Sequence, residues 1–153
     1  MIYVECKPDF TLVKSITGIP KREIIHAGGK SEVCKRLEKN KNHKGVVDED
    51  PWSVQPPYLK KLETKENLSD YELKLLDDNN DNRLIVLCPR LEDWILKTAK
   101  EADVDVRKYN LPEDPTKLHE VINNKIDKFD DLIENLKDHE RLKILKNLLM
   151  RKK

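Results

Sequence analysis

Short candidate strands alternate with helical segments in the first third of the chain, and this alternation restricts the fold more than any other feature. Candidate strands lie at 2–6, 22–26 and 45–47, and apolar residues at helical spacing lie between them over about 8–17 and 30–40. A strand–helix–strand–helix–strand order with short connections predicts right-handed crossovers and a parallel sheet. The expected fold class is therefore α/β, with a mostly parallel sheet flanked by helices.

The middle of the chain predicts a loop followed by two further strands. Residues 51–70 contain three prolines and little periodicity, so we expect a loop insertion with one helical turn near 58–62. Strands are expected at 71–76 and 84–88, either as a hairpin or with the second strand at the centre of the sheet. A helix is expected over about 90–102.

The last third of the chain predicts two helices. Apolar residues follow helical spacing from Leu118 to Leu136, and again from Leu142 to Leu149. We expect residues 112–150 to form a helical extension that packs on an α/β domain made of residues 1–105.

Composition limits the kinds of protein that this chain can be. It has 153 residues, of which 37% are hydrophobic and 39% are charged, which allows one domain with a modest core. No apolar run is long enough to span a membrane, and the start lacks the pattern of a signal peptide. We therefore expect a cytoplasmic protein without a membrane partner. Three cysteines without CxxC spacing argue against a zinc ribbon or a disulfide framework.

The charges are distributed unevenly along the chain. Residues 1–47 carry ten Lys or Arg against five Asp or Glu, whereas residues 48–82 carry four against ten. A basic region beside an acidic one suits a protein that attracts a polyanion and holds a cation. Chance clustering on a charge-rich surface is the alternative.

Carboxylates stand directly at the ends of two of the expected strands. Glu5 and Asp9 follow the first strand, and Asp48 and Asp50 follow the third. Open parallel sheets bind ligands at the carboxyl ends of their strands, and Mg²⁺ or Mn²⁺ prefers oxygen ligands. These four residues are therefore predicted metal ligands for phosphodiester chemistry with two ions, in which Glu5 and Asp9 hold one ion and Asp48 and Asp50 bridge or hold the second. The alternative for each residue alone is a helix cap or an ordinary polar loop.

These acidic segments resemble the motifs of the Toprim family. Val4-Glu5-Cys6-Lys7-Pro8-Asp9 resembles its first motif, and Val46-Val47-Asp48-Glu49-Asp50 resembles its Asp-x-Asp motif. A glycine turn, here Gly28-Gly29, is also common after the second strand of the family. The resemblance covers residues 1 to about 100 and implies a Toprim-like, Rossmann-like fold that acts on nucleic acid.

The resemblance also implies roles for individual residues. Glu5 would act in acid–base chemistry or metal binding, Asp48 and Asp50 would bind magnesium, and Asp9 would be a further ligand. Leu91-Glu92-Asp93-Trp94 resembles a segment of the nuclease branch, which would place Glu92 near the metal. An acid that faces a helix dipole is an equal alternative for Glu92. Cys6 stands where the family usually has glycine.

Four further residues are candidates to contact phosphate. Gly28, Gly29 and Lys30 begin a helix whose amino end can hold an anion, although Ile24 stands where a P-loop needs glycine. Lys7 lies within the first acidic motif and is a candidate to contact phosphate or to stabilise a leaving group. A solvated surface role is the alternative for each lysine. Trp52 is expected to pack under its loop, with base stacking as the alternative.

The leading hypothesis is a small Toprim-like nuclease that depends on magnesium or manganese and cleaves DNA or RNA. Glu5, Asp9 and Lys7 would be its catalytic residues. One alternative is a Toprim-like module that binds a nucleotide or nucleic acid without cleaving it. Another is a structural or partner protein that acts through the helical extension. The sequence also allows the protein to form a homo-oligomer.

Overall fold

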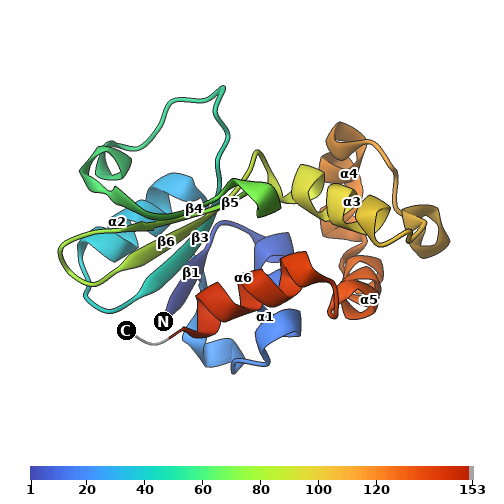
Figure 1. The fold of residues 1–153 in the computed structure, drawn as a ribbon, viewed down its shortest axis with the longest axis horizontal. Helices are drawn as coiled ribbons and strands as arrows, with labels where there is room; N and C mark the ends of the chain where they lie inside the picture. The colour runs from blue at the N-terminus through green and yellow to red at the C-terminus, as the bar shows by residue number, and fades with distance from the viewer. Residues whose placement is uncertain (152–153) are drawn as a thin grey trace.

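A six-stranded mixed sheet forms the centre of the computed structural model, which describes residues 1–151 (Figure 1). The strands lie in the order β2-β1-β3-β6-β5-β4. The strands β2, β1, β3 and β6 are parallel to one another, whereas β5 pairs antiparallel with both β6 and β4. The predicted α/β class with a mostly parallel sheet is therefore confirmed. The strands are β1 Ile2–Val4, β2 Ile24–His26, β3 Lys44–Asp48, β4 Glu63–Leu68, β5 Leu73–Asp77 and β6 Arg83–Leu87.

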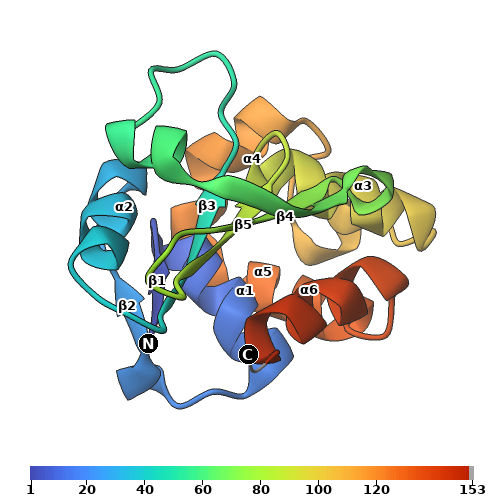
Figure 2. The same cartoon turned by 60° about the vertical axis from the view of Figure 1, so that its left-hand side comes forward.

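Helices cover both faces of the sheet and gather beyond the carboxyl ends of its parallel strands. The helix α2 lies on one face, and α1 and α6 lie side by side on the other (Figures 1 and 2). Near the carboxyl end of β6 lie α3, α4 and α5 (Figure 1). The α-helices are α1 Lys7–Thr17, α2 Lys30–Glu38, α3 Leu91–Glu101, α4 Pro115–Val121, α5 Ile126–Leu136 and α6 Glu140–Met150. Short 3-10 helices lie at Lys21–Glu23, Pro57–Lys61, Ser69–Tyr71, Val106–Tyr109 and Ile122–Asn124.

The larger core joins the sheet to the C-terminal helices. Val4, Val46 and Ile85 on the strands belong to the same buried cluster as Phe129 of α5 and Leu145 of α6. Because these apolar positions are fully buried, the stripe of the last helices serves the core of the protein. None of the helices in residues 1–151 is long and apolar enough to cross a membrane.

The expected loop over residues 51–70 is only partly a loop, because β4 occupies Glu63–Leu68. This strand forms the edge of the sheet and is mostly exposed, so it shows no apolar alternation in the sequence. Its pairing with β5 shifts register between Thr64 and Glu66. The expected helical turn is present as the 3-10 helix Pro57–Lys61.

The strand β6 meets both expectations for residues 84–88, as one strand of a hairpin and as a central strand. The strand β6 pairs antiparallel with β5 and parallel with β3, so both readings of its sequence hold. The expectation of two C-terminal helices is wrong, since the first splits into α4 and α5. The apolar spacing continues across the break, and only Asn123 and Asn124 mark it in the sequence.

A buried arginine fixes α6 against α3. The guanidinium of Arg141 lies over the ring of Trp94, with its Cζ 4.7 Å from the ring centroid. It donates hydrogen bonds to Thr98 Oγ1 at 2.8 Å and to the Trp94 carbonyl at 3.1 Å, and it pairs with Glu72 at 3.2 Å. Since Arg141 is only 1% exposed, these partners replace the water that its charge loses.

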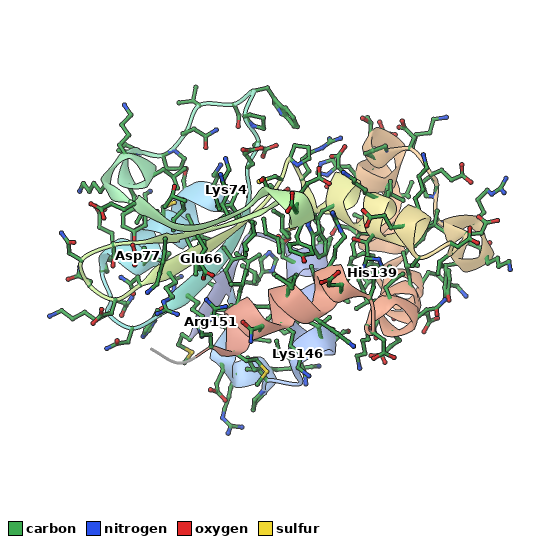
Figure 3. All side chains as sticks on the ribbon, viewed as in Figure 1. Glu66, Lys74, Asp77, His139, Lys146 and Arg151 are labelled. Atoms are coloured by element: carbon green, nitrogen blue, oxygen red, sulfur yellow. The ribbon has the colours of Figure 1, made fainter. Side chains whose placement is uncertain are left out.

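The far end of α6 is joined to the sheet by polar contacts. Lys44 of β3 donates to the carbonyls of Leu149 and Arg151, at 2.7 and 2.9 Å. The guanidinium of Arg151 pairs with Glu66 of β4 (Figure 3). These bonds satisfy carbonyls at the carboxyl end of α6 that have no partner within the helix.

Gly45 allows α2 to pack closely on β3. A Cβ at this position would lie 2.7 Å from Val33 Cγ1 and 3.1 Å from Leu37 Cδ1. These distances are shorter than normal contacts between carbon atoms, so a side chain at this position would push α2 away from the sheet.

We expect Gly45→Ala to destabilise the protein by about 1–3 kcal/mol, because the added methyl group overpacks the interface of α2 and β3. For a chain of this size, each kcal/mol lowers the Tm by about 2–4 °C. Thermal unfolding followed by circular dichroism measures the change. In a Val33→Ala background the same substitution should cost less, because the closest atom has been removed. An equal cost in both backgrounds would contradict this explanation.

Candidate functional site

Two hydrogen bonds join the carboxyl ends of β1 and β3 to the start of α3. Because β1 and β3 are parallel neighbours, Glu5 and Asp48 lie at the same end of the sheet, where the carboxyl ends of the parallel strands meet. The backbone N–H of Asp48 donates to Glu5 Oε2 at 2.7 Å. The backbone N–H of Leu91 in turn donates to Asp48 Oδ1 at 2.9 Å, so Asp48 accepts from one of the free donors at the amino end of α3.

Asp9 lies at the start of α1 and is almost completely buried. Its Oδ2 accepts hydrogen bonds from the backbone N–H of Cys6 at 3.2 Å and from the Cys6 thiol at 3.1 Å. Its Oδ1 is buried without a hydrogen-bond partner. Asp9 is therefore a helix cap through one oxygen, while its second oxygen is unsatisfied.

Glu92 also has one unsatisfied oxygen in the interior. This second residue of α3 is 3% exposed, and its Oε1 has no hydrogen-bond partner. Its Oε2 lies 3.3 Å from Nδ1 of His119, which is on α4. Sequence reasoning did not assign His119 to this site, because a single histidine 27 residues away carries no spacing signal.

Charges of neighbouring carboxylates contribute to raised pKa values of Asp48, Asp9 and Glu5. Burial, followed by the charges of Asp9, Glu5 and Glu92, raises the pKa of Asp48 to about 9. Burial and the charge of Glu5 raise the pKa of Asp9 to about 7. Burial also raises the pKa of Glu5, although its hydrogen bond from Asp48 opposes this. We refer to Glu5, Asp9, Asp48 and Glu92 as the carboxylate cluster.

Asp50 lies at the margin of the cluster, and Glu49 is turned to another partner. The charge of Asp50 contributes to the raised pKa of Glu5. The backbone of Asp50 is in the left-handed region, with φ at 44°, where the chain turns out of β3. Glu49 forms an ion pair with Lys74 of β5 at 2.8 Å.

Burial also raises the pKa of the Cys6 thiol, followed by the effect of Asp9. The thiol is therefore held in its protonated form, in which it donates to Asp9. Cys6 thus takes a structural role at the start of α1.

The predicted phosphate contacts lie on two sides of the cluster. Lys7 is exposed and lines a hollow of about 530 Å³ together with Lys125 and Lys128. Lys30 reaches the segment after β3, where its Nζ donates to the carbonyl of Glu49 at 2.7 Å. Two other hollows, near the end of α3 and beside α4, are lined by none of the predicted site residues.

Gly28 and Gly29 form the turn before α2. Their φ angles of 104° and 157° lie where residues with side chains are strained, so the two glycines let the chain enter the helix at this point. The charge of Lys30, which follows them, acts on Glu5 and opposes the rise of its pKa. The structure therefore brings the amino end of α2 near the carboxylate cluster.

The cluster fits a hard cation in its chemistry but not in its present arrangement. Within residues 1–151, no group of three or more His, Cys, Asp or Glu side chains is arranged so that it could hold one metal ion. The two buried oxygens without partners are nevertheless the kind of ligand that Mg²⁺ and Mn²⁺ prefer. Binding an ion would therefore have to draw these carboxylates together.

Among known proteins, the chain matches no family model, no curated protein and no solved structure.

We expect Asp48→Asn to stabilise the protein at neutral and alkaline pH in the absence of divalent ions. The pKa of Asp48 is 3.8 in ordinary surroundings and about 9 in the folded protein. The folded state therefore keeps a proton that the unfolded chain loses above about pH 4, so stability declines as the pH rises toward about 9. Asn has no such proton to lose, and it can still accept from Leu91.

The measurement is the Tm of both proteins in EDTA from about pH 5 to about pH 9. The advantage of Asp48→Asn should grow with pH and reach on the order of 1 kcal/mol, or about 2–4 °C. Asp105→Asn is the matched control, because Arg107 lowers the pKa of Asp105 and removing that carboxylate should not stabilise. If Asp48→Asn lowered the Tm at every pH, the cluster would not be under electrostatic strain.

Proposed function

We propose that this chain is a Toprim-like nuclease that uses magnesium or manganese to hydrolyse phosphodiester bonds in DNA or RNA. One observation carries the proposal. Four carboxylates from β1, α1, β3 and α3 meet at one edge of the sheet, and two of their oxygens are buried without a partner. A folded protein rarely keeps such groups unless they serve a ligand or a reaction.

A divalent cation would relieve the repulsion within the carboxylate cluster. Asp9 Oδ1 and Glu92 Oε1 are oxygens with a free coordination site, and Asp48 has a second oxygen besides the one that accepts from Leu91. When bound, the ion would polarise a phosphate oxygen and make a water molecule more acidic. Asp50 at the margin of the cluster is a further ligand in this proposal, as its place in the Asp-x-Asp motif implies.

The residues of the chain would then share the remaining work. Glu5 is the proposed proton acceptor for the attacking water, because burial raises its pKa toward the range that suits a general base. Asp9 orients the start of α1 and with it Lys7, which is exposed two residues away. Lys7 is proposed to contact the phosphate group of the substrate on which negative charge develops during the reaction.

The hollow beside Lys7 favours a polyanionic substrate. Its lining includes Lys7, Lys125 and Lys128, with Asp127 as its single carboxylate. Side chains of Asn110, Asn123 and Asn124 complete its polar lining and are suited to phosphate and sugar oxygens. Lys7 connects the hollow to the cluster along the chain, since it lies two residues from both Glu5 and Asp9.

A non-catalytic module that binds a nucleotide or nucleic acid is the second candidate. It is favoured by the observation that no three ligand groups in residues 1–151 are arranged around one point. It also agrees with the hydrogen bonds that use Asp9 Oδ2 to cap α1. In this candidate the same cluster would hold at most one ion weakly, next to a bound phosphate.

We expect the protein to cleave single-stranded or double-stranded DNA or RNA in the presence of magnesium or manganese, and not in EDTA. Glu5→Gln should slow cleavage by about 10²–10⁴-fold, the usual effect of removing a general base. Gel assays with end-labelled DNA and RNA measure the rate. Glu49→Gln is the matched control, because Glu49 pairs with Lys74 and should leave the rate nearly unchanged.

Thermal unfolding with and without the ion separates the two candidates. Magnesium or manganese should raise the Tm of the wild-type protein and raise that of Asp48→Asn much less. An ion-dependent shift together with nucleic-acid binding but no cleavage would favour the non-catalytic module. No cleavage and no ion-dependent shift would refute the proposed site.

A further inference from the structure

Trp52 is exposed beside the carboxylate cluster, where the sequence favoured packing under a loop. Its exposed fraction is 64%. Among residues 1–151 the exposed large apolar side chains are Met1, Trp52, Val54 and Met150, and only Trp52 is aromatic. The exposed indole presents a large, flat apolar surface with one polar group, which a ligand in solution can contact.

The ring of Trp52 is held next to the start of α3. The guanidinium of Arg90 lies over it, with Cζ 5.5 Å from the ring centroid. Arg90 is itself fixed by Asp93, whose Oδ2 accepts from its Nε at 2.8 Å. The next residue, Leu91, donates the hydrogen bond to Asp48, so the ring is linked to the cluster through two adjacent residues.

The segment that carries Trp52 is ordered by its own hydrogen bonds. The Gln55 amide donates to the carbonyls of Asp50 and Ser53, at 2.9 and 3.0 Å. Lys30 fixes the beginning of the segment through the carbonyl of Glu49. The segment between β3 and the 3-10 helix Pro57–Lys61 projects away from the sheet in both views (Figures 1 and 2). The ring is therefore presented to solvent by a preformed turn.

We propose that Trp52 is a stacking platform for an unpaired base, so that the substrate is a single-stranded or locally unpaired nucleic acid. This inference rests on the proposed function, because it places the platform beside the phosphodiester that the cluster would cleave. An exposed indole offers a stacking surface that every base can use. A base within a duplex is already stacked on its neighbours, so only an unpaired base is free to bind in this way.

The charged groups around the ring favour a nucleic acid that binds together with a cation over an apolar peptide as its occupant. Arg90 lies over the ring, and Lys30 reaches the start of the loop that carries it. Asp93, Glu92 and Asp50 also act on Arg90, so a phosphate backbone would approach the ring together with the cation of the proposed site. Arg90 also stabilises the ring by a cation–π contact, which fixes its orientation before a base arrives. An apolar peptide would need a groove, whereas Trp52 is a single projecting side chain next to the fully solvated Val54.

The two tryptophans allow a direct test by fluorescence. Trp94 is completely buried, so a ligand in solution should change the emission of Trp52 alone. The titration is carried out in a buffer that contains calcium in place of magnesium. We expect an oligothymidylate of about 12 nucleotides to quench the emission of the wild-type protein. The same quenching should be absent in Trp52→Phe, which retains only Trp94. A duplex of the same length should quench much less.

Binding measured by anisotropy of a labelled oligonucleotide gives an independent readout. Trp52→Ala should weaken single-strand binding about 5- to 150-fold, and Trp52→Phe should weaken it less, because Phe can still stack. Val54→Ala is the matched control, since Val54 is exposed on the same turn and should leave binding unchanged. Equal quenching by the duplex, or unchanged binding by Trp52→Ala, would overturn the stacking proposal. So would a change of emission with protein concentration alone, which would assign Trp52 to contacts between copies.

The outcomes also separate this proposal from the proposed nuclease activity. If the protein cleaves nucleic acid and Trp52→Ala cleaves single strands as fast as wild type, the platform is refuted while the nuclease stands. If no nucleic acid is cleaved but single strands still quench Trp52, the platform stands and the nuclease is refuted. If neither occurs, both proposals fail.

Discussion

The hydrogen bonds from Asp48 to Glu5 and from Leu91 to Asp48 hold the site together. They connect β1, β3 and α3, and each bond joins residues that are 43 positions apart in the chain. Each bond uses a carboxylate oxygen to satisfy a backbone donor at the end of an element, where no partner in the same element exists. The carboxylates therefore have a structural role besides the chemical role proposed for them, because they satisfy backbone donors where β1, β3 and α3 meet.

This gathering opposes the stability of the fold. Burial and mutual repulsion favour the protonated forms of Asp9 and Asp48, and Asp9 and Glu92 each leave an oxygen unsatisfied. The surrounding core is well packed, and Arg141 fixes α6 against the same helix that begins at the site. A rigid frame around a strained group is the arrangement expected where binding or reaction, and not folding, has determined the residues.

The sequence was most informative where structure depends on neighbouring residues. The elements β1, α1 and β3 follow local patterns. Because β1 and β3 are parallel neighbours and α1 directly follows β1, the positions of Glu5, Asp9 and Asp48 could be predicted from them. The burial of Glu92 could not, since it depends on the packing of α3 and on His119 from α4. The break between α4 and α5 was missed because the apolar spacing passes through it unchanged.

Trp52 shows a different limit. Its exposure depends on hydrogen bonds of Gln55 and Lys30, which link backbone groups that no periodicity marks. Hydrophobicity alone predicts that a tryptophan is buried. The exposure of Trp52 follows from the three-dimensional path of the turn, which the sequence pattern does not show.

The character of β4 has a consequence for how copies of this chain can meet. An edge strand exposes backbone donors and acceptors to which another chain can add, but β4 is rich in charge and has a register shift between Thr64 and Glu66. The opposite edge is β2, which has only three residues. Both borders of the sheet thus resist strand addition and amyloid-like stacking, so any assembly of this protein would have to form through side-chain surfaces on its helices and loops.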